Sequence, residues 1–177
     1  PDFPGREVKR LTVSYYSHDG KDGPWRGTVR VYLPTELPEA NKGFVAICPR
    51  GSLPSSLMPD VDMERDYAVG TALLLDIPVC TMPQTGEHFG LKEIHQLSDY
   101  MTSRFLDTND PSWLALYSFA TLYMRSATLV GKLVGKPTEK IMHMGSSITA
   151  HQGFKVAQCD PRLVGLMATG SSGLYSK

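Results

Sequence analysis

The most informative segment of the chain reads Lys140-Ile141-Met142-His143-Met144-Gly145-Ser146-Ser147-Ile148-Thr149-Ala150. Residues 140–144 are mostly apolar and favour a buried strand, whereas residues 147–158 have the pattern of a helix. A Gly-x-Ser motif stands between the two. A serine on a tight strand-to-helix turn has a strained backbone conformation that exposes its hydroxyl. The segment therefore predicts such a turn, with Ser147 as a candidate nucleophile and Ser146 as the competing serine.

Small residues beside such a turn let the helix pack closely against the strand. Gly145 supplies the first of them, but the second glycine of Gly-x-Ser-x-Gly is Thr149 here, followed by Ala150. Two other interpretations of the segment stay open. The serine can cap the helix through its side-chain oxygen, or it can belong to a phosphate-binding helix N-terminus.

Strand and helix patterns alternate on both sides of this turn. Three further short apolar runs suit strands that are buried on both faces; they occupy residues 43–48, 77–82 and 163–168. Helical spacing covers residues 63–75, 94–106 and 113–134. Asp110-Pro111-Ser112 offers an N-terminal cap for the last of these helices.

The first third of the chain predicts an antiparallel hairpin. Residues 8–16 and 25–33 are two runs with strand character, separated by turn-forming residues at 18–24. Pro34 follows the second run and cannot donate to a strand ladder. A hairpin that leads into alternating strands and helices is typical of an α/β architecture with right-handed crossovers.

The bulk composition argues against several classes of function. The 177 residues include 18 Lys plus Arg and 18 Asp plus Glu, so no net charge favours nucleic acid or an anionic membrane. Even residues 113–134 are interrupted by polar side chains and are not expected to span a membrane. No signal peptide is visible in the first residues. We expect neither nucleic acid nor a membrane as a partner.

The cysteines and histidines predict no metal or other cofactor. Cys48, Cys80 and Cys159 are too few for a disulfide framework, lack metal-ligand spacing, and fit small buried side chains. One acidic, histidine-containing stretch invites a metal interpretation, but its spacing fits no zinc pattern and favours a solvated loop; its residues are Glu87, His88, Glu93 and His95.

The residues after Ser147 offer a poor base and a poor acid. His151 lies four positions along the same helix, which is not where a catalytic base is expected, and Asp160 before Pro161 suggests a turn. Of the remaining histidines, His143 is expected to be buried on the strand and His18 to lie in the hairpin turn. If Ser147 is a nucleophile, its acid and base lie outside this segment.

Several segments in order resemble one known family. They are residues 145–147 with Asp160-Pro161-Arg162-Leu163-Val164 after the helix, Trp25-Arg26 and Pro34 around the second strand, and Asp110-Pro111-Ser112-Trp113 before the long helix. Together they resemble the PhoPQ-activated pathogenicity-related family of α/β-hydrolase-like proteins. Members carry Gly-Ala-Ser-Lys-Arg-Gly at the turn, so Ile148-Thr149-Ala150 departs from that pattern.

The resemblance implies a fold and an incomplete site. It implies that residues 1–177 are the N-terminal portion, strands one to six, of a single α/β-hydrolase-like domain with a mostly parallel sheet and an N-terminal antiparallel hairpin. The sheet is then incomplete on its C-terminal side, and a missing C-terminal segment or a second chain completes it. The oxyanion donors are the N–H of Ile148 and an N–H of Gly51 or Ser52.

The function implied is acyl transfer by a serine hydrolase, an esterase or peptidase-like enzyme, on a small-molecule ester or amide. A periplasmic or secreted location is also implied by the resemblance. The alternative is a non-catalytic α/β-hydrolase-like module for binding or assembly. The altered Ile148-Thr149-Ala150 segment and the lack of a suitable histidine after Ser147 motivate that alternative.

Overall fold

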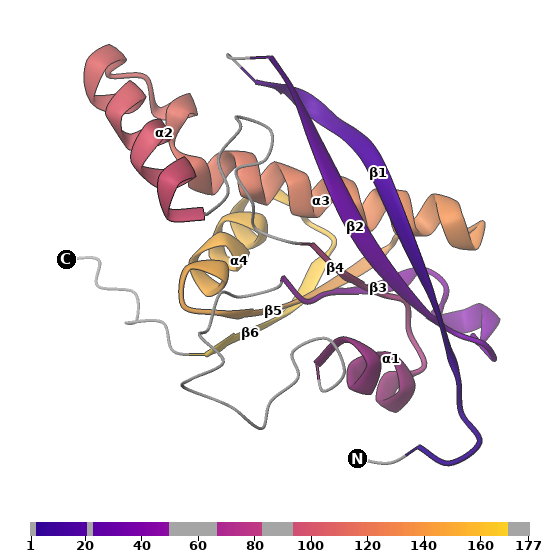
Figure 1. Cartoon of the computed structure of the whole chain (residues 1–177). Helices are drawn as coiled ribbons and strands as arrows, with labels where there is room; N and C mark the ends of the chain where they lie inside the picture. Colours follow the sequence, from indigo (N-terminus) through magenta and orange to yellow (C-terminus); the bar gives the residue numbers. More distant parts are fainter. Residues whose placement is uncertain (1–2, 21–22, 50–66, 83–93, 170–177) are drawn as a thin grey trace.

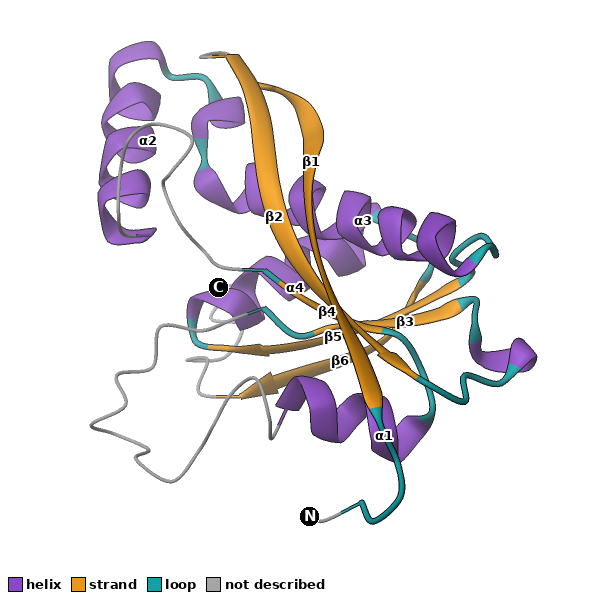
Figure 2. Cartoon of the chain, turned by 45° about the vertical axis from the view of Figure 1, so that its right-hand side comes forward, coloured by secondary structure: helices purple, strands orange, loops and turns teal. Residues whose placement is uncertain are grey.

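The computed structural model describes residues 3–20, 23–49, 67–82 and 94–169. These residues contain one six-stranded sheet in the order β1-β2-β4-β3-β5-β6 (Figures 1 and 2). The strands are β1 (Val8–Gly20), β2 (Gly23–Pro34), β3 (Phe44–Ile47), β4 (Val79–Thr81), β5 (Lys140–Ser146) and β6 (Leu163–Thr169). β1, β2 and β4 pair antiparallel, whereas β4, β3, β5 and β6 are parallel neighbours. The predicted parallel sheet with an N-terminal hairpin is confirmed.

Helices cover both faces of this sheet. They are α1 (Gly70–Leu75), α2 (Ile94–Thr108), α3 (Ala115–Val134) and α4 (Ile148–Cys159), with short 3₁₀ turns η1 (Glu39–Asn41) and η4 (Pro111–Trp113). α3 and α4 lie on one face of the sheet and α1 lies on the other (Figure 1). Of the predicted helix 63–75, the described residues 67–75 are helical, with a π-helical turn at 67–69 that leads into α1, and residues 63–66 lie outside the described residues.

The core alternates along β3 between these two layers. Val45 and Ile47 belong to the cluster that α3 and α4 cover, whereas Ala46 and Cys48 belong to the cluster around α1. All four side chains are buried. Successive strand residues point to opposite faces, so a strand covered on both sides reads as an unbroken apolar run.

Two sequence predictions about single residues are wrong. His18 lies on β1 and not in a turn, because pairing continues past a bulge after Tyr16 to the pair Gly20 and Gly23. The His18 ring stacks on Trp25, with 5.4 Å between ring centroids and 17° between planes. Cys159 is exposed as the last residue of α4, whereas Cys48 and Cys80 are buried as expected.

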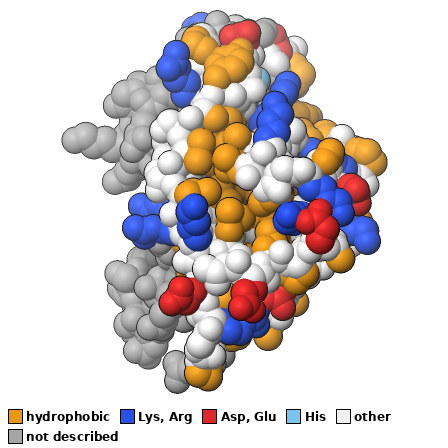
Figure 3. Space-filling model, turned by 90° about the vertical axis from the view of Figure 1, so that its right-hand side faces the viewer, with side chains coloured by type: hydrophobic (Ala, Val, Ile, Leu, Met, Phe, Trp, Pro, Cys, Tyr) orange, Lys and Arg blue, Asp and Glu red, His pale blue; other side chains and the backbone are white. Residues whose placement is uncertain are grey.

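The long β1–β2 hairpin forms one side of the molecule. On the face that this side presents, hydrophobic side chains form a strip between basic residues (Figure 3). Leu11 and Val13 of β1 are half-buried and pack against the core under α3. Among the described helices, none combines the length and the apolarity that a membrane span requires.

Candidate functional site

Ser147 occupies the junction between β5 and α4 in a strained conformation. Its φ is 52° and its ψ is −123°. In the described ranges, Asp76 and Asn109 are the other non-glycine residues with positive φ, and both are types that tolerate the left-handed region. Asp76 is left-handed helical, with ψ 44°, but Ser147 is not. A conformation of this kind costs about 1–3 kcal/mol, and it is the strained turn that the Gly-x-Ser motif predicts.

Within the described part of the chain, the hydroxyl of Ser147 makes no structural hydrogen bond. The residue is exposed, and its side chain makes no capping hydrogen bond to α4. Its main chain is bonded instead: the N–H donates to the Thr169 carbonyl at 2.9 Å, and the carbonyl accepts from the Ala150 N–H at 3.0 Å. The interpretation of Ser147 as a side-chain helix cap is therefore not supported.

Residues around Ser147 let α4 lie directly on β5. A Cβ atom added to Gly145 would come within 2.6 Å of the Thr149 carbonyl carbon and oxygen, so only glycine fits there. The side chain of Thr149 is buried, and its Oγ1 accepts from the Ser146 N–H at 2.6 Å and donates to the Ser146 carbonyl at 2.7 Å. The missing second glycine is thus replaced by a threonine whose hydroxyl bonds the strand end.

His143 lies beneath this turn and is fully buried, as the sequence predicted. Its Nε2 bonds the Thr149 carbonyl at 2.9 Å, so Nε2 carries the proton and donates. The ring also packs against Tyr123, with 5.3 Å between centroids. Burial lowers the pKa of His143 to about 4, partly opposed by the hydrogen bond to Thr149. A neutral, bonded and buried imidazole is not placed to accept the Ser147 proton.

The other two residues weighed after Ser147 lie along and beyond α4. His151 is exposed, and its ring contacts Phe154. The His151 backbone N–H donates to the Ser147 carbonyl at 3.3 Å, but among the described residues no hydrogen bond joins the His151 ring to the Ser147 hydroxyl. Asp160 is buried and accepts from the Arg162 Nη2 at 2.6 Å, the Arg162 Nε at 2.9 Å and the Arg162 N–H at 3.0 Å. These bonds lower the pKa of Asp160, and the predicted turn at Asp160 is confirmed.

The proposed oxyanion donors are less completely described. Ile148 is the first residue of α4, where the leading N–H groups have no intrahelical partner. Gly51 and Ser52 lie outside the described residues, as do Glu87, His88 and Glu93. The backbone of His95 belongs to α2. In the part of the chain that the structure describes, no group of three His, Cys, Asp or Glu residues could hold a metal ion.

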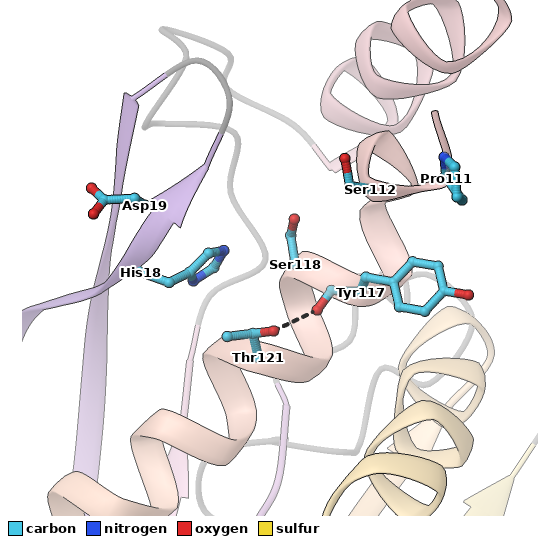
Figure 4. Close-up of a pocket in the computed structure, with 7 residues that line it drawn as sticks. All are labelled: His18, Asp19, Pro111, Ser112, Tyr117, Ser118 and Thr121. Atoms are coloured by element: carbon cyan, nitrogen blue, oxygen red, sulfur yellow. Dashed lines mark hydrogen bonds between the residues drawn. The ribbon is translucent and has the colours of Figure 1, made fainter. Parts of the chain in front are cut away.

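A hollow of about 550 Å³ lies between β1 and the start of α3, and no sequence pattern predicted it. Its wall includes His18 of β1, which is far in sequence from the other two elements, together with Ser112 of η4 and Ser118 of α3. Figure 4 shows the His18 ring pointing toward Ser118, whereas Asp19 points the other way. The Thr121 hydroxyl donates to the Tyr117 carbonyl at 2.9 Å and is already satisfied.

Solved structures of two enzymes resemble this arrangement of strands and helices. Candida antarctica lipase A in its closed state has a TM-score of 0.58 at 13% identity, over 93% of this chain and 38% of the lipase. Esterase Est22 has a TM-score of 0.52 at 11% identity, over 98% of this chain and 47% of the esterase. The fold is that of the α/β-hydrolases.

The α/β-hydrolase fold is what these similarities establish. No family model matches the sequence, and no curated protein matches it in sequence. The comparisons therefore support the α/β-hydrolase fold without supporting the narrower resemblance to the PhoPQ-activated family. The chain spans less than half the length of either enzyme.

Proposed function

We propose that this chain carries the nucleophile of a serine hydrolase, with Ser147 attacking the carbonyl carbon of a small-molecule ester or amide. One observation carries the proposal: a non-glycine residue has a strained φ and ψ at the β5–α4 junction, with an exposed hydroxyl that takes no part in capping α4. Residues with strain of this kind cluster at active sites and ligand-binding sites. The similarity of the fold to a lipase and an esterase supports the same class of reaction.

The local geometry suits the first step of acyl transfer. Attack by the Ser147 oxygen moves the carbonyl π electrons onto oxygen, which becomes an oxyanion and needs N–H donors. The Ile148 N–H at the start of α4 is the first proposed donor, and the positive end of the helix dipole favours the same charge. A backbone N–H of Gly51 or Ser52 is the second proposed donor.

The Ser147 proton must pass to a base, which an acid orients. His143 is buried and bonded to Thr149, and Asp160 is committed to Arg162. We therefore place both the base and the acid outside residues 1–177, whose fold is then the N-terminal portion of a longer α/β-hydrolase domain.

β6 supports this proposal of an incomplete domain. It is the last strand in the sheet order, and its Val164 and Met167 are 59% and 41% exposed. Apolar side chains on an edge strand favour pairing with a further strand, from the remaining polypeptide or from a second chain. Membership of the PhoPQ-activated pathogenicity-related family, with its implied periplasmic or secreted location, is a narrower form of the same proposal.

One observation favours the alternative of a non-catalytic, hydrolase-like binding module. Among the described residues no histidine or carboxylate bonds the Ser147 hydroxyl. A serine hydrolase requires that base in the complete protein, whereas a binding module does not.

A fluorophosphonate probe separates the two proposals. We expect the complete protein to be labelled at Ser147, as mapped by mass spectrometry of its peptides. The Ser146→Ala variant should still be labelled, whereas Ser147→Ala should not. Labelling at another residue, or no labelling of a folded protein, would overturn the proposed nucleophile, and the second outcome would favour the binding module.

A further inference from the structure

The turn before Ser147 is held by a side chain that the Gly-x-Ser-x-Gly pattern does not contain. Thr149 takes the place of the second glycine, and its side chain is fully buried. We propose that Thr149 is a positioning residue for Ser147, whose hydroxyl clamps the peptide groups of Ser146 while His143 holds the Thr149 carbonyl. This inference rests on the proposed function of Ser147.

The Thr149 hydroxyl both accepts and donates a hydrogen bond in the clamp. A threonine hydroxyl can donate one hydrogen bond and accept others. Thr149 Oγ1 accepts from the Ser146 N–H at 2.6 Å and donates to the Ser146 carbonyl at 2.7 Å. Both peptide groups of the residue directly before Ser147 are therefore fixed by one side chain. The strain at Ser147 follows immediately along the chain, where φ changes to 52°.

His143 holds the backbone carbonyl of Thr149. Its Nε2–H donates to the Thr149 carbonyl at 2.9 Å in a fully buried position between β5 and α4. Gly153 makes room for the ring, because an added Cβ there would lie 2.5 Å from the His143 Cδ2. A continuous set of contacts thus runs from His143 through Thr149 to Ser146 and the nucleophile.

This arrangement explains why a threonine can stand where a glycine is usual. Gly145 accommodates the Thr149 backbone, since a Cβ at Gly145 would come within 2.6 Å of it. The Thr149 side chain then turns toward the Ser146 peptide groups that it bonds. A glycine at this position has no side chain to bond those groups, so the clamp depends on the threonine of this chain.

Two substitutions test the clamp in the complete protein. Thr149→Val keeps the side-chain volume and removes both hydrogen bonds, whereas Thr149→Ser keeps the hydroxyl. We expect Thr149→Val to lower kcat for an activated ester, and the rate of fluorophosphonate labelling at Ser147, by about 10-fold or more, because small misplacements of a reacting group are costly. KM should change by less than about 3-fold, and Thr149→Ser should retain most of the wild-type rate.

A third variant guards against misfolding of Thr149→Val. Thr149→Gly restores the Gly-x-Ser-x-Gly pattern without the hydroxyl, and no new atom can clash. We expect its labelling rate to fall as in Thr149→Val, with the folded state checked by circular dichroism. Wild-type labelling rates in either folded variant would overturn the clamp.

The outcome is distinguishable from failure of the proposed function. If Ser147 of the folded wild type is not labelled, the proposed hydrolase fails, and hydrogen exchange of the Ser146 amide then judges the clamp. Exchange about 10-fold faster in Thr149→Val, and near wild type in Thr149→Ser, would support it. Equal Ser146 exchange in the wild type and Thr149→Val would overturn it.

Discussion

The two ends of α4 use their polar side chains in opposite ways. At the N-terminal end, Ser147 is exposed and strained, and its hydroxyl makes no hydrogen bond to another described residue. At the C-terminal end, Asp160 is 6% exposed and accepts several hydrogen bonds from Arg162. Arg162 extends this network to α3 by donating to the Thr128 hydroxyl at 3.0 Å.

The difference separates residues that stabilise from residues that are available for chemistry. A buried carboxylate with bonded partners stabilises the folded state and cannot easily leave its partners. An exposed hydroxyl on a strained residue contributes no such stability, yet it is free to meet a substrate. Hydrogen-bond commitment therefore distinguishes the two ends more clearly than residue type does.

Removing the hydroxyl at the N-terminal end should give the largest effect on activity. We expect Ser147→Ala to reduce ester hydrolysis by the complete protein by ~10³-fold or more. The free energy of unfolding should change by less than about 0.5 kcal/mol, because no described contact is lost. Hydrolysis rates and urea unfolding of the same preparation check both parts. Activity that survives the substitution would remove the functional contrast between the two ends.

As the pH falls, protonation linked to His143, below the N-terminal end of α4, should lower the stability of the fold before protonation of Asp160 at the C-terminal end does. The pKa of His143 is about 4 in the folded protein, below its ordinary value of 6.5. The unfolded chain therefore binds a proton that the folded protein does not, and stability falls as the pH drops from 6.5 to 4. This contribution amounts to about 3 kcal/mol. Asp160 stays ionised in that window, because Arg162 holds its pKa below the ordinary range.

Urea unfolding between pH 7 and pH 4 checks this order, with His143→Gln as the matched variant. The free energy of unfolding of this variant should depend less on pH between 6.5 and 4 than that of the wild type. If its stability falls as steeply as that of the wild type, His143 is not the titrating group.

Breaking the C-terminal network should reduce stability without altering chemistry. We expect Asp160→Ala to lower the free energy of unfolding by about 2 kcal/mol, because the Arg162 guanidinium loses its carboxylate partner but keeps its bond to Thr128 and can still reach water. Fluorophosphonate labelling of the folded fraction should keep its wild-type rate. Glu39→Ala, which removes the exposed pair with Lys42, is the control and should have little effect. A slower labelling rate in Asp160→Ala would show that the two ends are coupled.

The sequence predicted the fold more fully than the site. Apolar runs such as residues 43–48 are local signals of a strand buried on both faces, and the structure places β3 there. The Gly-x-Ser turn was also predictable, because its motif lies within a few consecutive residues. The structure shows why the motif has this form: α4 lies so close to β5 that Gly145 has no room for a side chain, and Ser147 has a strained backbone. Such features depend on neighbouring residues in the chain.

Contacts between distant segments were not predictable in the same way. The bond from Arg162 to Thr128 and the hollow beside His18 join elements that periodicity cannot bring together. Thr149 appeared only as a departure from a motif, because its hydrogen bonds to Ser146 depend on the exact path of the turn. The position of His18 on β1 was missed because residues 18–24 have the composition of a turn. In the structure the strands stay paired to Gly20 and Gly23, and the His18 ring stacks on Trp25 of the neighbouring strand.

The smallest expected effect measures the strain at the N-terminal end directly. Ser147→Gly should relieve about 1–3 kcal/mol of backbone strain, offset by about 0.5–1 kcal/mol from the greater freedom of glycine in the unfolded chain. We expect a net gain of about 1 kcal/mol in the free energy of unfolding, together with complete loss of labelling. Asn109→Gly is the control, since Asn109 also has a positive φ of 52° but is a type that tolerates it. If the two variants gain equally, Ser147 carries no special strain, and the contrast between the ends of α4 reduces to exposure and hydrogen bonding.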